Sequence, residues 1–213
     1  MLTTETKFRI AEYGILFASI ILHEVSHGWA ALALGDDTAK RAGRLSLNPL
    51  VHIDPLGSVI LPALLIISGT GVLFGWAKPV PVNVGRLRHP RNDAVITSLA
   101  GPAMNIVLVA VTYFALRGLH PETFWPLNLL LYAGLINIWL ACFNLIPVPP
   151  LDGSAVIERM LPHKWWGPYL AIRPYTLLLV FGVVIIGDRS GTFTNAFNWI
   201  LLHWSSATGY PLP

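Results

Sequence analysis

The 213-residue sequence has few charged residues, which make up 12% of the chain. An ordinary soluble domain has about 25%. Hydrophobic residues make up 54%, the mean hydropathy is +0.60, and the apolar residues form several runs. Several of these runs approach the length of about 20 residues that crosses a bilayer as a helix. This composition excludes a soluble globular protein and predicts an integral membrane protein.

Cysteine is nearly absent, and the single Cys142 excludes both disulfides and thiolate zinc cages. The net charge of +3 comes from basic residues scattered through the connecting loops, so nucleic acid is not an expected partner. No polar stretch approaches the roughly 50 residues of a small soluble domain. We therefore expect residues 1–213 to form a single integral-membrane domain.

Six apolar segments are expected. They cover about residues 10–34, 56–76, 94–116, 127–146, 175–187 and 193–204. Glycines and prolines interrupt the second segment, which is typical of a broken, re-entrant element whose backbone is buried in protein. The proline-rich residues 78–82 after it are expected to be extended and β-like, with an edge that a substrate strand could pair with. The last segment predicts an interfacial amphipathic helix. The predicted fold class is an all-α polytopic membrane protein with about four to five transmembrane helices.

The basic residues bear on the topology of the second segment. If this segment is re-entrant, ten Lys and Arg residues lie on one side of the membrane and four on the other; if it spans, the division is nine against five. The positive-inside rule hardly separates these two arrangements.

Residues 23–27, His-Glu-Val-Ser-His, form an H-E-x-x-H motif. On a helix, His23 and His27 share one face, so both imidazoles can reach one zinc ion while Glu24 lies beside it. From seven His and five Glu, the number of matches expected by chance is roughly 0.005. The alternative is a pair of hydrogen-bonded core histidines, but burying these groups in hydrocarbon without a metal is costly.

A catalytic zinc site needs a third protein ligand and an open position. His52 and Asp54 lie in a loop rich in turn residues, where a role in turns is the favoured interpretation. Asp152 is the stronger candidate, because it follows a stiff proline-rich stretch and precedes the flexible Gly153. Its alternative role is to cap a helix that begins near Ser154.

These motifs together resemble the site-2 proteases, which are intramembrane zinc metalloproteases that cut membrane-spanning substrates. Three motifs occur in the family's order: H-E-x-x-H, then Gly101-Pro102-x-x-Asn105, then Asn144-x-x-Pro147-x-x-x-Leu151-Asp152-Gly153. The stretch 75–83, Gly-Trp-Ala-Lys-Pro-Val-Pro-Val-Asn, is similar to the compact bacterial and archaeal branch, without PDZ or CBS domains.

The resemblance implies that His23, His27 and Asp152 bind one Zn²⁺ per chain and that Glu24 is the catalytic base. The expected partners are transmembrane protein or peptide substrates and the lipid bilayer; a homo-oligomer is left open. The catalytic core is expected at about 9–160 and C-terminal membrane segments at about 169–204. A zinc shared by α-helical His27 and the distant Asp152 requires a re-entrant second segment, which places the active site near the cytoplasmic face of a prokaryotic cell membrane.

Two amides at membrane depth, Asn105 and Asn144, are candidates for binding the oxyanion or the substrate backbone. The alternative is that they join helices or satisfy backbone groups. Two other functions compete with proteolysis. An inactive relative acting as a membrane scaffold or chaperone is disfavoured by the intact Glu24, and a transporter is disfavoured by the lack of inverted repeats.

Overall fold

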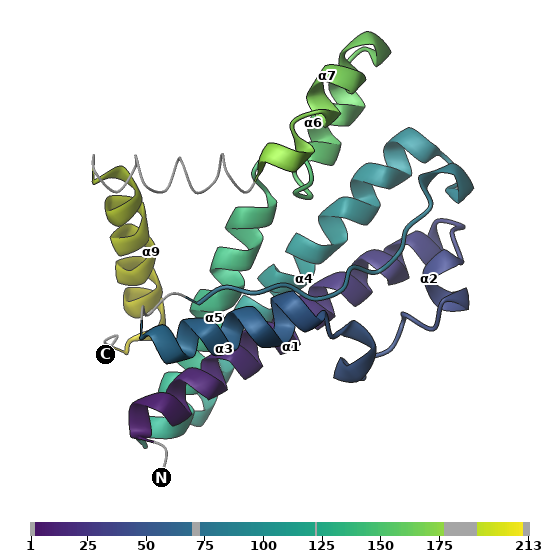
Figure 1. Ribbon diagram of the computed structural model, residues 1–213. Helices are drawn as coiled ribbons and strands as arrows, with labels where there is room; N and C mark the ends of the chain where they lie inside the picture. Colours follow the sequence, from purple (N-terminus) through teal and green to yellow (C-terminus); the bar gives the residue numbers. More distant parts are fainter. Residues whose placement is uncertain (1–2, 70–72, 122, 177–190, 211–213) are drawn as a thin grey trace.

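The computed structural model describes residues 3–69, 73–121, 123–176 and 191–210, in which the regular secondary structure is helical (Figure 1). Within these residues, three helices are long and apolar enough to cross a membrane: α1 (Thr4–Ala33), α4 (Pro90–Leu119) and α5 (Phe124–Asn144). They correspond to the first, third and fourth apolar segments of the sequence. The expected segment 175–187 lies almost wholly outside the described residues. The protein is an all-α integral membrane protein.

Shorter elements connect and flank these three helices. The other α-helices in the described part of the chain are α2 (Thr38–Arg41), α3 (Leu61–Ser68), α6 (Ser154–Met160), α7 (Trp166–Leu170) and α9 (Thr192–Thr208). Single 3₁₀ turns cover Pro49–His52, Val84–Arg86, His163–Trp165 and Arg173–Tyr175, and a π-helical stretch at Pro55–Ile60 leads into α3. The short helix expected at 193–204 is present as α9.

Helix α9 packs against α5 through aromatic side chains: Phe197 stacks on Trp139 with ring centroids 5.3 Å apart, and Trp204 is buried between the helices. Trp204 is buried in a cluster with Leu116, Leu131 and Leu135, and its indole N–H donates to the Leu131 carbonyl at 3.1 Å. Gly134 makes this approach feasible, because a Cβ added there would overlap the Trp204 ring. The lack of a side chain at Gly134 therefore allows α9 to pack closely against α5.

The chain between α1 and α4 leaves one end of α1 and comes back to it. Helix α3 runs beside α1, and an extended return segment (residues 73–83) runs back toward the start of α4 (Figure 1). At the meeting point, Arg88 N–H donates to the Leu34 carbonyl at 3.0 Å. The end of α1 and the beginning of α4 are therefore neighbours, and the second apolar segment is re-entrant.

The return segment is extended, as the sequence predicts, but it pairs with no described β-strand. Its backbone is held instead by single contacts: Trp76 N–H to the Gly57 carbonyl at 3.2 Å, and Lys78 N–H to the His52 carbonyl at 2.9 Å. Pro79 and Pro81 have no N–H, so a regular ladder along the edge that they occupy has no donors.

Asp36, just beyond α1, fixes the end of the return segment. Its carboxylate is buried and accepts hydrogen bonds from the Asn83 N–H at 2.6 Å, the Thr38 N–H at 3.0 Å and the Thr38 hydroxyl. Burial raises the pKa of Asp36, but these hydrogen bonds and the Arg86 guanidinium lower it more, so the pKa lies below its ordinary value of 3.8. The folded protein therefore favours the ionised form.

The Asp36 carboxylate should make stability depend on acid pH. Because its pKa is lower in the folded state, its contribution is fully present above the unfolded pKa and is lost as pH falls below 3.8 through the folded pKa. We expect Asp36→Asn to reduce the free energy of unfolding by about 1–3 kcal/mol near neutral pH, and less in acid. Thermal unfolding in detergent, with the half-exposed Asp37→Asn as control, measures this. If Asp36→Asn lowered the free energy of unfolding equally near neutral pH and in acid, this prediction would be contradicted.

Candidate metal centre

Two turns of α1 and the loop after α5 bring together three side chains of the types that can bind a metal. The Nε2 atoms of His23 and His27 are 3.1 Å apart. Asp152 places Oδ2 at 3.1 Å from His23 Nε2 and Oδ1 at 3.4 Å from His27 Nε2. One ligand atom from each residue lies within 4.8 Å of the others, and both imidazoles are buried. The arrangement is that of residues around a single ion.

The partners of the two Nδ1 atoms indicate which ring nitrogens carry protons. His27 Nδ1 lies 2.7 Å from the Thr97 carbonyl, which can only accept, so Nδ1 carries the proton. His23 Nδ1 lies 2.6 Å from Asn105 Oδ1, which is likewise an acceptor. In neutral imidazoles both Nε2 atoms then carry lone pairs, directed at each other and at the Asp152 carboxylate.

This set of atoms fits a metal ion. Asp152 Oδ2 is buried without a hydrogen-bond donor, and its near neighbour, His23 Nε2, is an acceptor in the tautomer described above. Three buried lone-pair donors facing one another are unfavourable unless a cation lies among them. Two imidazoles and one carboxylate match the ligand types of zinc in catalytic sites.

A hydrogen-bonded chain of two amides and a hydroxyl begins at Nδ1 of His23. Asn105 is fully buried, and its Nδ2 donates to Asn137 Oδ1 at 2.8 Å. Asn137 Nδ2 in turn donates to Ser19 Oγ at 3.0 Å and to the Ala133 carbonyl at 2.8 Å. The chain links α4, α5 and α1 in the helix bundle. Sequence reasoning missed Asn137 and Ser19, although polar residues inside apolar segments are the available signal.

Helix α4 is shaped to fit against the imidazoles. A Cβ built on Gly101 would lie 2.5 Å from His27 Nε2 and 2.6 Å from His23 Nε2, so only glycine leaves that space open. Pro102, inside the helix, lacks the N–H that would bond the carbonyl of Ser98. The neighbouring carbonyl, of Thr97, accepts from His27.

The loop after α5 places Asp152 by closing back on the end of that helix. Gly153 N–H donates to the Asn144 carbonyl at 2.7 Å, and a Cβ on Gly153 would overlap the Leu145 carbonyl oxygen. Gly153 has ordinary helical dihedrals, so lack of space, not flexibility, requires glycine there. The N-terminal cap of α6 is Gly153, without a side-chain cap. The carboxylate of Asp152 faces the imidazoles instead of capping α6.

Glu24 lies next to the two imidazoles on α1 and contacts the return segment. Its Oε2 accepts a hydrogen bond from the Val80 N–H at 2.8 Å. Gly28, one turn later, allows this approach, because a Cβ there would lie 2.9 Å from a Val80 methyl and overlap Leu45. The extended segment therefore packs directly over the turn of α1 that carries Glu24.

The other polar candidates form hydrogen bonds with backbone groups near them in the chain. Asn144 Nδ2 donates to the Leu140 carbonyl of its own helix at 3.0 Å. Asp54 Oδ1 accepts from the Leu56 and Gly57 N–H groups, and His52 Nε2 donates to the Ser46 carbonyl at 2.7 Å. His52 and Asp54 stabilise turns, in agreement with the favoured sequence interpretation.

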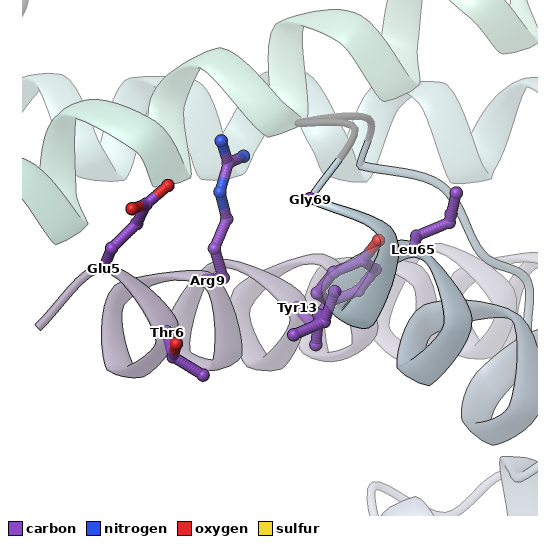
Figure 2. A pocket seen from close by; sticks show the side chains of 7 residues that line it. Glu5, Thr6, Arg9, Tyr13, Leu65 and Gly69 are labelled. Carbon is purple, nitrogen blue, oxygen red and sulfur yellow. The ribbon is translucent and has the colours of Figure 1, made fainter. Parts of the chain in front are cut away.

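A separate cavity of about 190 Å³ lies where α3 ends beside the N-terminal part of α1 (Figure 2). Its lining includes Arg9, Tyr13 and Leu65. Tyr13 precedes His23 by ten residues, or about 15 Å of helix, so this cavity is not part of the metal centre.

Comparison with known proteins agrees with this geometry. Residues 119–181 match the model of Peptidase family M50. The chain is 39% identical over 156 residues to "Putative zinc metalloprotease YwhC" of Bacillus subtilis, covering 69% of this chain and 67% of that protein. It is 34% identical over 165 residues to "Putative zinc metalloprotease Rip2" of Mycolicibacterium smegmatis, covering 70% of this chain and 60% of that protein. Rip2 of Mycobacterium tuberculosis is 29% identical over 187 residues, covering 85% of this chain and 69% of that protein. No solved structure matches.

The fold and the comparisons define a membrane-embedded metalloprotease whose cofactor is zinc. The chain belongs to Peptidase family M50, the site-2 proteases. It spans 60% to 69% of the length of the three relatives named above.

The open space at Gly101 gives a direct test of the metal centre. We expect Gly101→Ala to weaken zinc binding at least about tenfold, because the added methyl group must displace an imidazole or α4. The matched control is Gly118→Ala on the same helix, where a Cβ meets nothing within 4 Å. Zinc per chain is measured after dialysis against a weak chelator. Equal zinc retention in the two variants would contradict the geometry.

Proposed function

We propose that this protein is an intramembrane zinc protease that hydrolyses peptide bonds within or near the transmembrane segments of membrane proteins. The observation that carries the proposal is the placement of three converging ligand atoms and Glu24 on and beside α1, a helix long enough to cross a membrane. His27 precedes the end of α1 at Ala33 by six residues, or about 9 Å. The reaction then takes place inside one face of the bilayer.

In this proposal His23, His27 and Asp152 hold one zinc ion. When bound, zinc supplies Lewis acidity, which lowers the pKa of water toward about 7 and polarises the scissile carbonyl. Glu24 accepts the proton of the attacking water on its carboxylate and delivers it to the nitrogen of the leaving amine. The pairing of Oε2 with Val80 N–H leaves Oε1 as the acceptor for that proton.

The residues behind the imidazoles orient them. The Thr97 carbonyl and the Asn105 amide each hold one Nδ1–H, which fixes both ring planes and directs both Nε2 atoms at the ion. These contacts favour a role for Asn105 in orienting His23 over one in binding the oxyanion. An oxyanion or substrate role for Asn144 stays a prediction from the sequence.

The substrate we propose is a membrane-spanning segment that unwinds locally. In a helix each carbonyl is hydrogen-bonded to the N–H four residues later, so a peptide bond must leave the helix before attack. The polar groups around the site can form hydrogen bonds with an unwound backbone, whereas lipid cannot.

We propose that the site faces the cytoplasm of a prokaryotic cell. If the second segment is re-entrant, the sequence count assigns ten Lys and Arg residues to the side of the site and four to the other, and the positive-inside rule makes the richer side cytoplasmic. Arg91 supports this grouping, since it donates to the Arg159 and Leu161 carbonyls and so joins the start of α4 to the end of α6. The catalytic core is then residues 9–160, with C-terminal membrane segments at 169–204, in one domain.

Replacing the proposed base separates catalysis from metal binding. We expect Glu24→Gln to lower the cleavage rate of a single-span test substrate at least about 100-fold, while one zinc per chain is retained. The amide of Gln keeps an acceptor for Val80 N–H, so the fold is undisturbed. Cleavage is followed with purified protein in detergent, and a chelator-treated wild-type sample is the second control.

Cleavage that survives in Glu24→Gln or in the chelated protein would contradict the proposal. An inert wild type that still binds one zinc per chain would favour the membrane scaffold instead.

A further inference from the structure

Arg44 is a buried cation that the proposed chemistry leaves unexplained. The residue is 9% exposed, and no carboxylate among the described residues lies within ion-pair distance of its guanidinium. Its Nη2 donates to the Lys78 carbonyl at 2.6 Å and to the Pro79 carbonyl at 3.2 Å. A buried guanidinium that binds only backbone carbonyls is costly, so its position calls for a reason beyond ion pairing.

The chain before Arg44 is built to aim it at the return segment. Helix α2 ends in a Schellman motif, in which Gly43 N–H bonds the Lys40 carbonyl at 3.0 Å and Arg44 N–H bonds the Ala39 carbonyl at 2.9 Å. Gly43 has a φ of +66°, which requires glycine. The reversal turns Arg44 from the end of α2 toward residues 78 and 79.

The peptide group between Pro79 and Val80 joins Arg44 to Glu24. Its carbonyl oxygen accepts from Arg44, and its N–H donates to Glu24 Oε2 at 2.8 Å. Because a trans peptide is planar, holding its oxygen also fixes the direction of its N–H. The positive guanidinium polarises the same peptide group, which strengthens its N–H as a donor to the carboxylate.

Two prolines flank Val80 and limit the backbone donors beside Glu24. Neither Pro79 nor Pro81 has an N–H, so between residues 79 and 81 only Val80 can donate. Val80 also precedes a proline, which restricts it to extended backbone. The segment is thus stiff at the point where it meets Glu24.

We propose that Arg44 is a positioning residue for Glu24 and that it acts through the peptide group between Pro79 and Val80. By fixing one carboxylate oxygen, this relay holds the other in the direction of the attacking water and the leaving nitrogen. The inference rests on the proposed function of Glu24 as the base. The inference gives a role in the site to a basic residue that lies outside the membrane helices.

The first test replaces Arg44 by residues that delete or keep its donors. Arg44→Met should lower kcat by about 10- to 100-fold with KM and zinc per chain unchanged, because Glu24 loses orientation while the zinc ligands are untouched. Arg44→Lys, which keeps a charged donor, should recover part of kcat. The matched control is the exposed Arg41→Met, which makes the same change of charge and should behave as wild type.

The second test removes the relay itself. Val80→Pro deletes the N–H that Glu24 accepts and should lower kcat to the same extent as Arg44→Met. Val82→Pro makes the same substitution beside Pro81, at a residue with no described hydrogen bond to Glu24, and serves as the control. In the double variant Arg44→Met/Val80→Pro the losses should not add, because both act on one contact. Additive losses, an unchanged kcat in Arg44→Met or a raised kcat in either single variant would overturn the proposal.

A third measurement does not depend on activity. The Val80 amide, observed by NMR in protein labelled with ¹⁵N-valine, should exchange slowly in wild type and in Glu24→Gln, and at least about tenfold faster in Glu24→Ala and Arg44→Met. An inert wild type with this exchange pattern would refute the proposed protease function but leave the relay intact. Equal exchange rates in all four proteins would overturn the relay whatever the activity.

Discussion

The approach of the Asp152 carboxylate to two imidazoles of α1 is the constraint on which the rest of the structure depends. Two buried imidazoles and a partly buried carboxylate, each presenting a lone pair, lie 3.1–3.4 Å apart and repel one another without a cation. Holding them there requires rigid support on every side. Thr97 and Asn105 fix the ring planes, Gly101 leaves the space, and Gly153 closes the loop that delivers the carboxylate.

The re-entrant segment makes this approach compatible with the membrane. After α1 the chain must return to the same side, so that α4 and α5, which cross in succession, bring Asp152 back to the depth of His27. The contact between Arg88 and Leu34 closes that return. The extended part of this segment also contacts the proposed base, because it lies over Glu24 and donates the Val80 N–H to its carboxylate. One element therefore sets both the topology and the surroundings of the proposed base.

Much of this arrangement could be predicted from the sequence. The spacing of His23 and His27 follows from the period of a helix, and the lengths of the apolar runs gave the three spanning helices to within a few residues at most ends. The prolines around Asp152 and the family's motif order single it out in the sequence, and the structure places its carboxylate beside the two imidazoles. The alternative in which Asp152 caps α6 is wrong, because the cap is Gly153 and the carboxylate turns to the imidazoles.

Other features could not be predicted, for identifiable physical reasons. The Thr97 carbonyl and the Val80 N–H are backbone groups, which every residue has, so nothing in the sequence marks them. Asn137 and Ser19 are 118 residues apart, and Arg44 lies 34 residues from Lys78. Contacts of this range depend on how the helices pack. The predicted β-like stretch is an extended segment held by side chains and by single backbone contacts, because Pro79 and Pro81 remove the donors of a ladder.

X-ray absorption at the zinc edge of the purified protein tests the central claim most directly, because it counts the ligands without a substrate. The account predicts two imidazole nitrogens at about 2.0–2.1 Å and carboxylate or water oxygens at about 2.0–2.2 Å, without sulfur. It also predicts that Asp152→Ala loses an oxygen ligand and keeps both imidazoles. A spectrum with a third imidazole or a sulfur ligand, or one unchanged by Asp152→Ala, would contradict the account.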